Sequence, residues 1–210
     1  LSYEQDLSQV LLTEFGKYWA TCNVLQSNKG VFGNIILSKY HPVDRGEIRF
    51  EKSTNMVVSA DYMIGGRRCR VYNCHLESYN MSMSSVVKSF REEPDVISDT
   101  GRKLRKSILR RSEQVARVFA HISTAEVPAI VCGDFNDTPV SYTYNVLSRG
   151  RRDSFTSAGS GFGASYSLLW PLLRIDYLFY PDSMNALAHR CPKVKYSDHY
   201  PVVVDLSIWK

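Results

Sequence analysis

The segment from Ile130 to Asn136 carries the densest set of side chains that could do chemistry. An apolar run ends at Gly133, and Asp134 and Asn136 follow two residues apart, so both can project an oxygen in the same direction. Such oxygens suit a hard divalent cation or a phosphate group. The same pair is also common in an Asx turn with a helix cap, and this segment alone leaves both interpretations open.

A second candidate lies in the run Val71–Leu76, where Asn73 and His75 alternate with less polar residues. Because successive side chains of a strand point to opposite faces, Asn73 and His75 share one face of the strand. The pattern predicts a polar pair at the end of a half-buried strand. The alternative is a histidine that is satisfied by a backbone carbonyl and has no chemical role.

Acidic and imidazole groups also occur together near the C-terminus. Asp198 and His199 precede the apolar strand Pro201–Ile208, and Asp176 lies in another strand-like run, Arg174–Tyr180. Adjacent residues point differently, so Asp198 can face a metal while His199 faces a substrate. A buried aspartate hydrogen-bonded to the second nitrogen of His199 would fix its tautomer and stabilise its protonated form.

The elements that must position these side chains have two periodicities. An apolar stripe at helical spacing predicts a helix over residues 101–122, and Ser141 can cap a second, shorter helix. Gly65-Gly66 between two strand-like runs predicts a hairpin turn. Many strands with few helices, not strictly alternating, suggest two packed sheets flanked by helices. Strands are expected at Val31–Ser38, Met56–Ile64, Arg68–Leu76, Ala129–Cys132, Arg174–Tyr180 and Pro201–Ile208.

Composition sets broader limits. The chain has 210 residues, enough for one domain over residues 1–210, and no apolar run approaches the roughly 18 residues that span a bilayer. The formal charge of +5 points weakly to an anionic partner, and the basic helix over residues 102–117 is either a phosphate clamp or a solvated surface. Five cysteines without a C-x-x-C pair argue against a zinc site or disulfide scaffold. Localisation stays open between the cytoplasm and attachment to a membrane through a segment upstream of Leu1.

Four motifs, taken in order, resemble the signature of the endonuclease/exonuclease/phosphatase superfamily. They are Asn-x-His-Leu at 73–76, Gly-Asp-Phe-Asn at 133–136, Arg-Ile-Asp-Tyr at 174–177 and Ser-Asp-His-Tyr-Pro-Val at 197–202. The resemblance implies the α/β class and the DNase I-like four-layer sandwich, in which two mixed β-sheets are flanked by helices. It also implies hydrolysis of a phosphoester by metal-activated water, on nucleic acid, phospholipid or inositol phosphate. The sequence identifies no protein partner.

The resemblance assigns a catalytic role to five residues. His75 matches the histidine that contacts the scissile phosphate or leaving group. Asp134 and Asn136 match the pair that orients the nucleophilic water and binds the phosphate or a second metal. Asp176 matches the partner of the last histidine, and His199 matches the general base or transition-state stabiliser.

Metal and phosphate binding are expected from an overlapping set of residues. Asp198 matches a metal ligand, and Asp134 is the second expected ligand for Mg²⁺ or Mn²⁺, the cofactor that the resemblance implies. Asn73, His75 and Asn136 are expected to bind the phosphate.

Some family features do not occur in the sequence. Members begin with a strand ending in Asn and a strand ending in Gln-Glu, whose Glu is a principal metal ligand, and Tyr3–Asp6 does not replace it. Asn34 lies near the position where nuclease-like members carry a glutamate that pairs with the first histidine. We therefore expect a domain incomplete at its N-terminus, with weak metal binding and self-association through the uncovered face. The alternative is a catalytically incompetent fragment that acts as a binding or assembly module.

Overall fold

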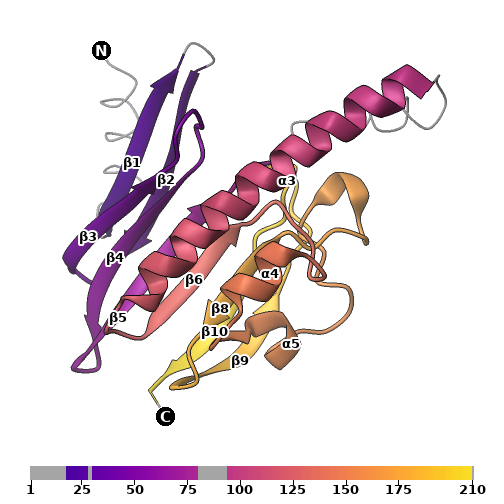
Figure 1. The fold of residues 1–210 in the computed structure, drawn as a ribbon. Coiled ribbons are helices and arrows are strands. Elements are labelled where there is room, and N and C mark those ends of the chain that lie inside the picture. Colours follow the sequence, from indigo (N-terminus) through magenta and orange to yellow (C-terminus); the bar gives the residue numbers. More distant parts are fainter. Residues whose placement is uncertain (1–17, 28–29, 80–93, 210) are drawn as a thin grey trace.

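The computed structural model of the protein describes residues 18–27, 30–79 and 94–209, and its centre is a six-stranded mixed sheet (Figure 1). The strand order is β3-β4-β5-β6-β8-β7; β5 and β6 run parallel and the other neighbours antiparallel. Because parallel neighbours need a crossover connection, the chain passes through a helix between β5 and β6. The strands are β3 Pro42–Arg49, β4 Met56–Ile64, β5 Arg67–His75, β6 Ala129–Asp134, β7 Arg152–Asp153 and β8 Asp176–Tyr180.

That crossover helix, α3 (Pro94–Ser123), covers one face of the sheet (Figure 1). Three shorter helices follow in the chain: α4 Tyr142–Leu147, which packs against α3, α5 Ser154–Ala158, which packs against β8 and β9, and the 3₁₀ helix η1 Ser167–Leu169. No helix in the part of the chain described here is long and apolar enough to cross a membrane. The main core lies between α3 and the sheet and includes Tyr72, Val115, Val118, Ile122, Val131 and Phe135.

The opposite face of the sheet is covered by two antiparallel strand pairs (Figure 1). One pair, β1 (Trp19–Ser27) and β2 (Gly30–Ser38), packs against β4, and β2 also contacts β5. The other pair is β9 (Met184–Arg190) and β10 (Val203–Ile208). A second, smaller core lies beneath β9 and contains Cys69, Ile130, Tyr180 and Met184.

The α/β class predicted from the sequence is confirmed, with one correction to the layers. Among the described residues, the second layer consists of two separate antiparallel pairs and not one mixed sheet, because no strand there joins β2 to β10. Residues 1–17, which include Tyr3–Asp6, lie outside the described part of the chain.

Most of the predicted elements are present. The predicted helix 101–122 extends over residues 94–123, and the Ser141 hydroxyl caps α4 by accepting from the backbone N–H of Tyr144 at 3.1 Å. Gly65 and Gly66, with φ of 58° and 79°, form the turn between β4 and β5 in a region that favours glycine. The patterns did not predict β1, β3, β7 or β9. The edge strand β3 is interrupted by charged residues, so it lacks the alternation that marks a half-buried strand.

Candidate active site

The ends of β5 and β6 and the start of β8 place three candidate side chains at one edge of the sheet. His75 ends β5 and pairs with Asp134, the last residue of β6, in the parallel register. Because β8 runs antiparallel to β6, its first residue, Asp176, pairs with Asp134 from the other side. Strand register alone therefore brings together residues that are far apart in the sequence.

The turn after β6 depends on two unusual backbone conformations. Gly133 has a φ of 127°, and a Cβ at this position would lie 2.0 Å from the carbonyl oxygen of Cys74. Asn136 has a φ of 51°, which asparagine tolerates better than most residues. Its backbone N–H donates to Oδ1 of Asp134 (2.8 Å), while Nδ2 donates to Oδ2 of Asp134 and to the Leu76 carbonyl (both 2.9 Å). An Asx turn is therefore present, and it fixes the Asp134 carboxylate at the strand end.

Asp176 and His199 form a hydrogen-bonded pair, with 2.8 Å between Oδ2 of Asp176 and Nδ1 of His199. The ring of Tyr166 packs edge-on against the imidazole, with 5.2 Å between the ring centroids. The hydrogen bond that His199 donates to the Asp176 carboxylate raises the pKa of His199, in opposition to burial, which lowers it. Because Nδ1 is held by the carboxylate, Nε2 is the nitrogen that is available to a ligand.

The candidate side chains surround a cleft of about 570 Å³. Its polar lining includes His75, Asp134, Asn136, Asp198 and His199, and its apolar wall includes Leu169, Leu173 and Ile175.

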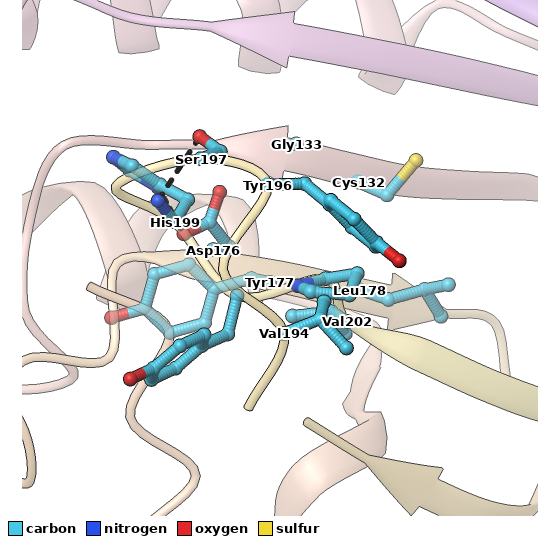
Figure 2. A pocket seen from close by; sticks show the side chains of 12 residues that line it. Cys132, Gly133, Asp176, Tyr177, Leu178, Val194, Tyr196, Ser197, His199 and Val202 are labelled. Atoms are coloured by element: carbon cyan, nitrogen blue, oxygen red, sulfur yellow. Dashed lines mark hydrogen bonds and ion pairs between the residues drawn. The ribbon is translucent and has the colours of Figure 1, made fainter. Parts of the chain in front are cut away.

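A second cavity, of about 460 Å³, lies on the Asp176 side of the pair (Figure 2). Its lining includes Cys132, Leu178, Val194 and Val202. His199 lines both cavities, whereas Asp176 lines only the second. The imidazole therefore stands between its carboxylate partner and the polar cleft.

Burial shifts the pKa values of two side chains that line the cleft. Burial, and after it the charge of Asp176, raises the pKa of Asp134 to about 7. Burial and the neighbouring His199 lower the pKa of His75, so this imidazole is neutral near pH 7. The cleft thus combines a carboxyl group that resists ionisation with one neutral imidazole and one that favours its protonated form.

Asp134, Asp176 and His199 offer ligand atoms that all lie within 4.8 Å of one another. A bound cation would favour the ionised form of Asp134, which burial and Asp176 disfavour in the protein alone. The two carboxylates are oxygen donors of the kind that Mg²⁺ and Mn²⁺ take in proteins, whereas imidazole suits other transition metals better. Asp134 and Asp176 therefore fit the expected metal through their oxygens.

Two predicted site residues lie apart from this cluster. The carboxylate of Asp198 is exposed at the edge of the cleft and accepts from the Ser197 hydroxyl at 3.1 Å. Asn73 does not line the cleft, and its Nδ2 donates to the Ile35 carbonyl at 2.9 Å. Asn34 donates to the Met56 and Asn73 carbonyls (2.9 and 3.1 Å) and so ties β2 to the central sheet. Metal binding by Asp198 and phosphate binding by Asn73 stay predictions.

Sequence patterns missed three residues beside the cleft. Tyr79 and Asp137 line it, and the Tyr79 hydroxyl donates to Oδ1 of Asp137 at 3.0 Å. Arg111 appeared to belong to a basic helix surface, but its side chain is only 1% exposed and its Nε donates to Asp137 at 3.1 Å. The sequence could have indicated Asp137 as a site residue, because it directly follows the candidate residue Asn136. By contrast, Arg102 and Lys103 are exposed, as a basic surface requires.

Solved structures of similar fold include the human Nocturnin catalytic domain with bound sulfate (TM-score 0.66, 18% identity, covering 99% of this chain and 78% of that one). D. rerio TDP2 in complex with a single-strand DNA product matches with a TM-score of 0.65 and 18% identity, over 96% of this chain and 82% of that one. A mannosyl-6-phosphatase of Bacteroides thetaiotaomicron matches with a TM-score of 0.63 and 16% identity, over 95% and 80% of the two chains. No curated protein sequence is significantly similar.

These structural similarities confirm the DNase I-like α/β fold. The sequence profile of one family covers most of the chain, from residue 3 to residue 199, and this match includes all the predicted site residues. The chain therefore belongs to the Endonuclease/Exonuclease/phosphatase family.

Proposed function

We propose that the protein hydrolyses phosphoester bonds with the help of a divalent metal ion. The observation that carries this proposal is the meeting of His75, Asp134, Asn136 and His199 in one cleft, with Asp176 bonded to the back of His199. Phosphoryl transfer needs positioning and neutralisation of developing negative charge more than it needs covalent chemistry. Two imidazoles beside an acidic metal site meet both needs.

Asp134 and Asp176 are the carboxylates that would hold Mg²⁺ or Mn²⁺, and Asp198 is a further candidate from the edge of the cleft. When bound, the ion supplies charge neutralisation and lowers the pKa of a water molecule. Asn136 uses its amide hydrogens on Asp134 and the Leu76 carbonyl, so its first contribution is to orient the Asp134 carboxylate. To contact a phosphate as predicted, Asn136 would either use its amide oxygen through a bridging water or turn its amide so that one of its hydrogens is released.

The two histidines have different roles in this proposal. His199 favours the protonated state because Asp176 accepts from its Nδ1, so it can place a positive charge beside the phosphoryl oxygens. His75 is neutral near pH 7 and half-buried at the strand end, so it can accept a proton or orient the phosphate. The pair therefore provides an acidic and a basic imidazole across one cleft.

Three substrate classes stay possible for the phosphoester: nucleic acid, phospholipid and inositol phosphate. The similar mannosyl-6-phosphatase adds sugar phosphates to these classes, and the similar structure with a DNA product supports nucleic acid. The apolar wall formed by Leu169, Leu173 and Ile175 would contact the part of the substrate beyond the phosphate.

The test is hydrolysis by the full chain of bis(p-nitrophenyl) phosphate, a DNA oligonucleotide, sphingomyelin, an inositol phosphate and mannose 6-phosphate, with Mg²⁺ or Mn²⁺ and with EDTA. His199→Ala should lower the rate by about 10²–10⁴-fold, the usual size of an acid–base contribution. The matched control is His41→Ala, since His41 is exposed and packs on Trp19 away from the cleft. Equal rates for the two variants, or no metal-dependent turnover of any substrate, would favour the binding-module alternative.

A further inference from the structure

Two polar side chains of α3 are buried against the sheet edge that carries the cleft. Arg111 is 1% exposed and Gln114, about one helical turn further on, is 4% exposed. Burying a guanidinium is expensive unless its hydrogen-bonding groups are used. Nε and Nη1 of Arg111 bond the two loops that leave β5 and β6, whereas its buried Nη2 has no hydrogen-bond partner among the described residues.

The first loop is held through the backbone of Glu77, two residues after His75. The backbone N–H of Glu77 donates to Oε1 of Gln114 at 2.8 Å, and Nη1 of Arg111 donates to the Glu77 carbonyl at 2.5 Å. β5 ends at His75, so these two contacts from the helix take the place of strand pairing. They fix the direction in which the chain leaves the strand end.

The second loop is held through Asp137, the residue after Asn136. Nε of Arg111 donates to Oδ2 of Asp137 at 3.1 Å, and the Thr143 hydroxyl donates to the same oxygen at 2.8 Å. The Arg111 guanidinium also lies over the ring of Tyr79, 4.2 Å from its centroid, while the Tyr79 hydroxyl donates to Asp137. One side chain therefore contacts both loops, and Tyr79 joins them a second time.

We propose that Arg111 and Gln114 are positioning residues that set the spacing between the loop after His75 and the loop that contains Asn136. This inference rests on the proposed function, since it concerns the geometry in which that chemistry takes place. Neither side chain lines the cleft, so neither acts on a substrate directly. Lysine cannot replace Arg111, because one ammonium on a flexible stem does not reproduce the planar fork that spans two acceptors.

The effect of losing this contact follows from the sensitivity of catalysis to distance. A misplacement of about 1 Å can cost on the order of 10²-fold in rate. Such a shift changes the alignment of His75 with the Asp134–Asn136 turn, and it leaves the cleft walls that hold the rest of the substrate in place. The expected signature is a fall in kcat with little change in KM.

The test uses Gln114→Met, which keeps the length of the side chain and removes the acceptor, together with Arg111→Lys. The matched control is Val118→Ala on the same helix, because Val118 is fully buried in the main core and bonds neither loop. Gln114→Met should lower kcat by about 10–100-fold with KM within about threefold, whereas Val118→Ala should lower the melting temperature and leave kcat near that of wild type.

A second measurement does not depend on activity. In wild type and in Val118→Ala, the Glu77 amide should exchange slowly with solvent, and in Gln114→Met it should exchange roughly tenfold faster or more, with a displaced His75 ring resonance. If no phosphoester is hydrolysed by wild type, the proposed function fails, and the exchange and resonance data still decide the positioning claim. Protection of Glu77 and an unmoved His75 resonance in Gln114→Met, or a kcat equal to that of Val118→Ala, would overturn the inference.

Discussion

Replacing Asp134 with asparagine should make the metal-free protein more stable at alkaline pH. The Asp134 carboxyl is half-buried beside Asp176, and this burial raises its pKa to about 7, against 3.8 for the unperturbed group. Above pH 7 the folded protein must hold this carboxylate in its charged form, which the buried site disfavours. Asparagine fills nearly the same volume without the charge, so it removes this penalty together with the metal ligand.

The magnitude follows from the two pKa values. Their difference is about 3 pH units, and each unit is worth about 1.4 kcal/mol, so the charged form destabilises the fold by about 4 kcal/mol when fully developed. A group whose folded pKa is raised adds stability below its unfolded pKa and loses it as the pH rises through its folded pKa. Between pH 5 and pH 8, wild type should therefore lose about 2–3 kcal/mol relative to Asp134→Asn. The altered hydrogen bonds to Asn136 add an offset that is the same at both pH values.

The assay is urea unfolding of wild type and Asp134→Asn at pH 5 and pH 8 in EDTA. The control is Asp182→Asn, an exposed carboxylate, which should change the free energy of unfolding by less than about 0.5 kcal/mol at either pH. If the difference in free energy of unfolding between wild type and Asp134→Asn is the same at pH 5 and at pH 8, the folded site does not disfavour the charged form of Asp134 and this reasoning is wrong. Excess Mg²⁺ or Mn²⁺ at pH 8 should stabilise wild type and leave Asp134→Asn unchanged.

Further predictions follow from single contacts. Gly133→Ala should cost more than about 4 kcal/mol or prevent folding, judged by circular dichroism, because its Cβ would meet the Cys74 carbonyl in a left-handed region. Asp176→Asn should lower the pKa of His199, measured by NMR titration, because the carboxylate that stabilises the imidazolium is gone. Arg174→Met should cost about 3–5 kcal/mol in urea unfolding by leaving its buried partner Asp153 unpaired. The unpaired outer edge of β10 among the described strands should promote self-association, seen as a melting temperature that depends on protein concentration.

The strand ends that form the cleft were predictable because their signals are local. Alternation placed His75 at the end of one strand, and the apolar run before Gly133 placed Asp134 at the end of another. The hydrogen bond between Asp176 and His199 was also expected, since the resemblance pairs an aspartate with the last histidine. In each case the chemistry follows from residues within a few positions of a strand boundary.

The remaining features depend on contacts between distant segments. Arg111 has the same local signal as its exposed neighbours, and only the docking of α3 onto the loops at Glu77 and Asp137 shows that it is buried. Asn73 shares a strand face with His75, but the packing of β2 draws its amide to the Ile35 carbonyl. The separation of the second layer into two pairs depends equally on strand pairing, which no local pattern specifies.

The proposed function requires that water attack a phosphoester at the cleft between His75 and His199. The most direct test is turnover in ¹⁸O-labelled water with Mg²⁺ or Mn²⁺, with the phosphate product and the alcohol product analysed separately by mass spectrometry. Attack by water at phosphorus should place one ¹⁸O atom per turnover in the phosphate product and none in the alcohol, and His199→Ala should lose the labelled product. Label in the alcohol, or labelled phosphate formed at the same rate by His199→Ala, would contradict the proposed function.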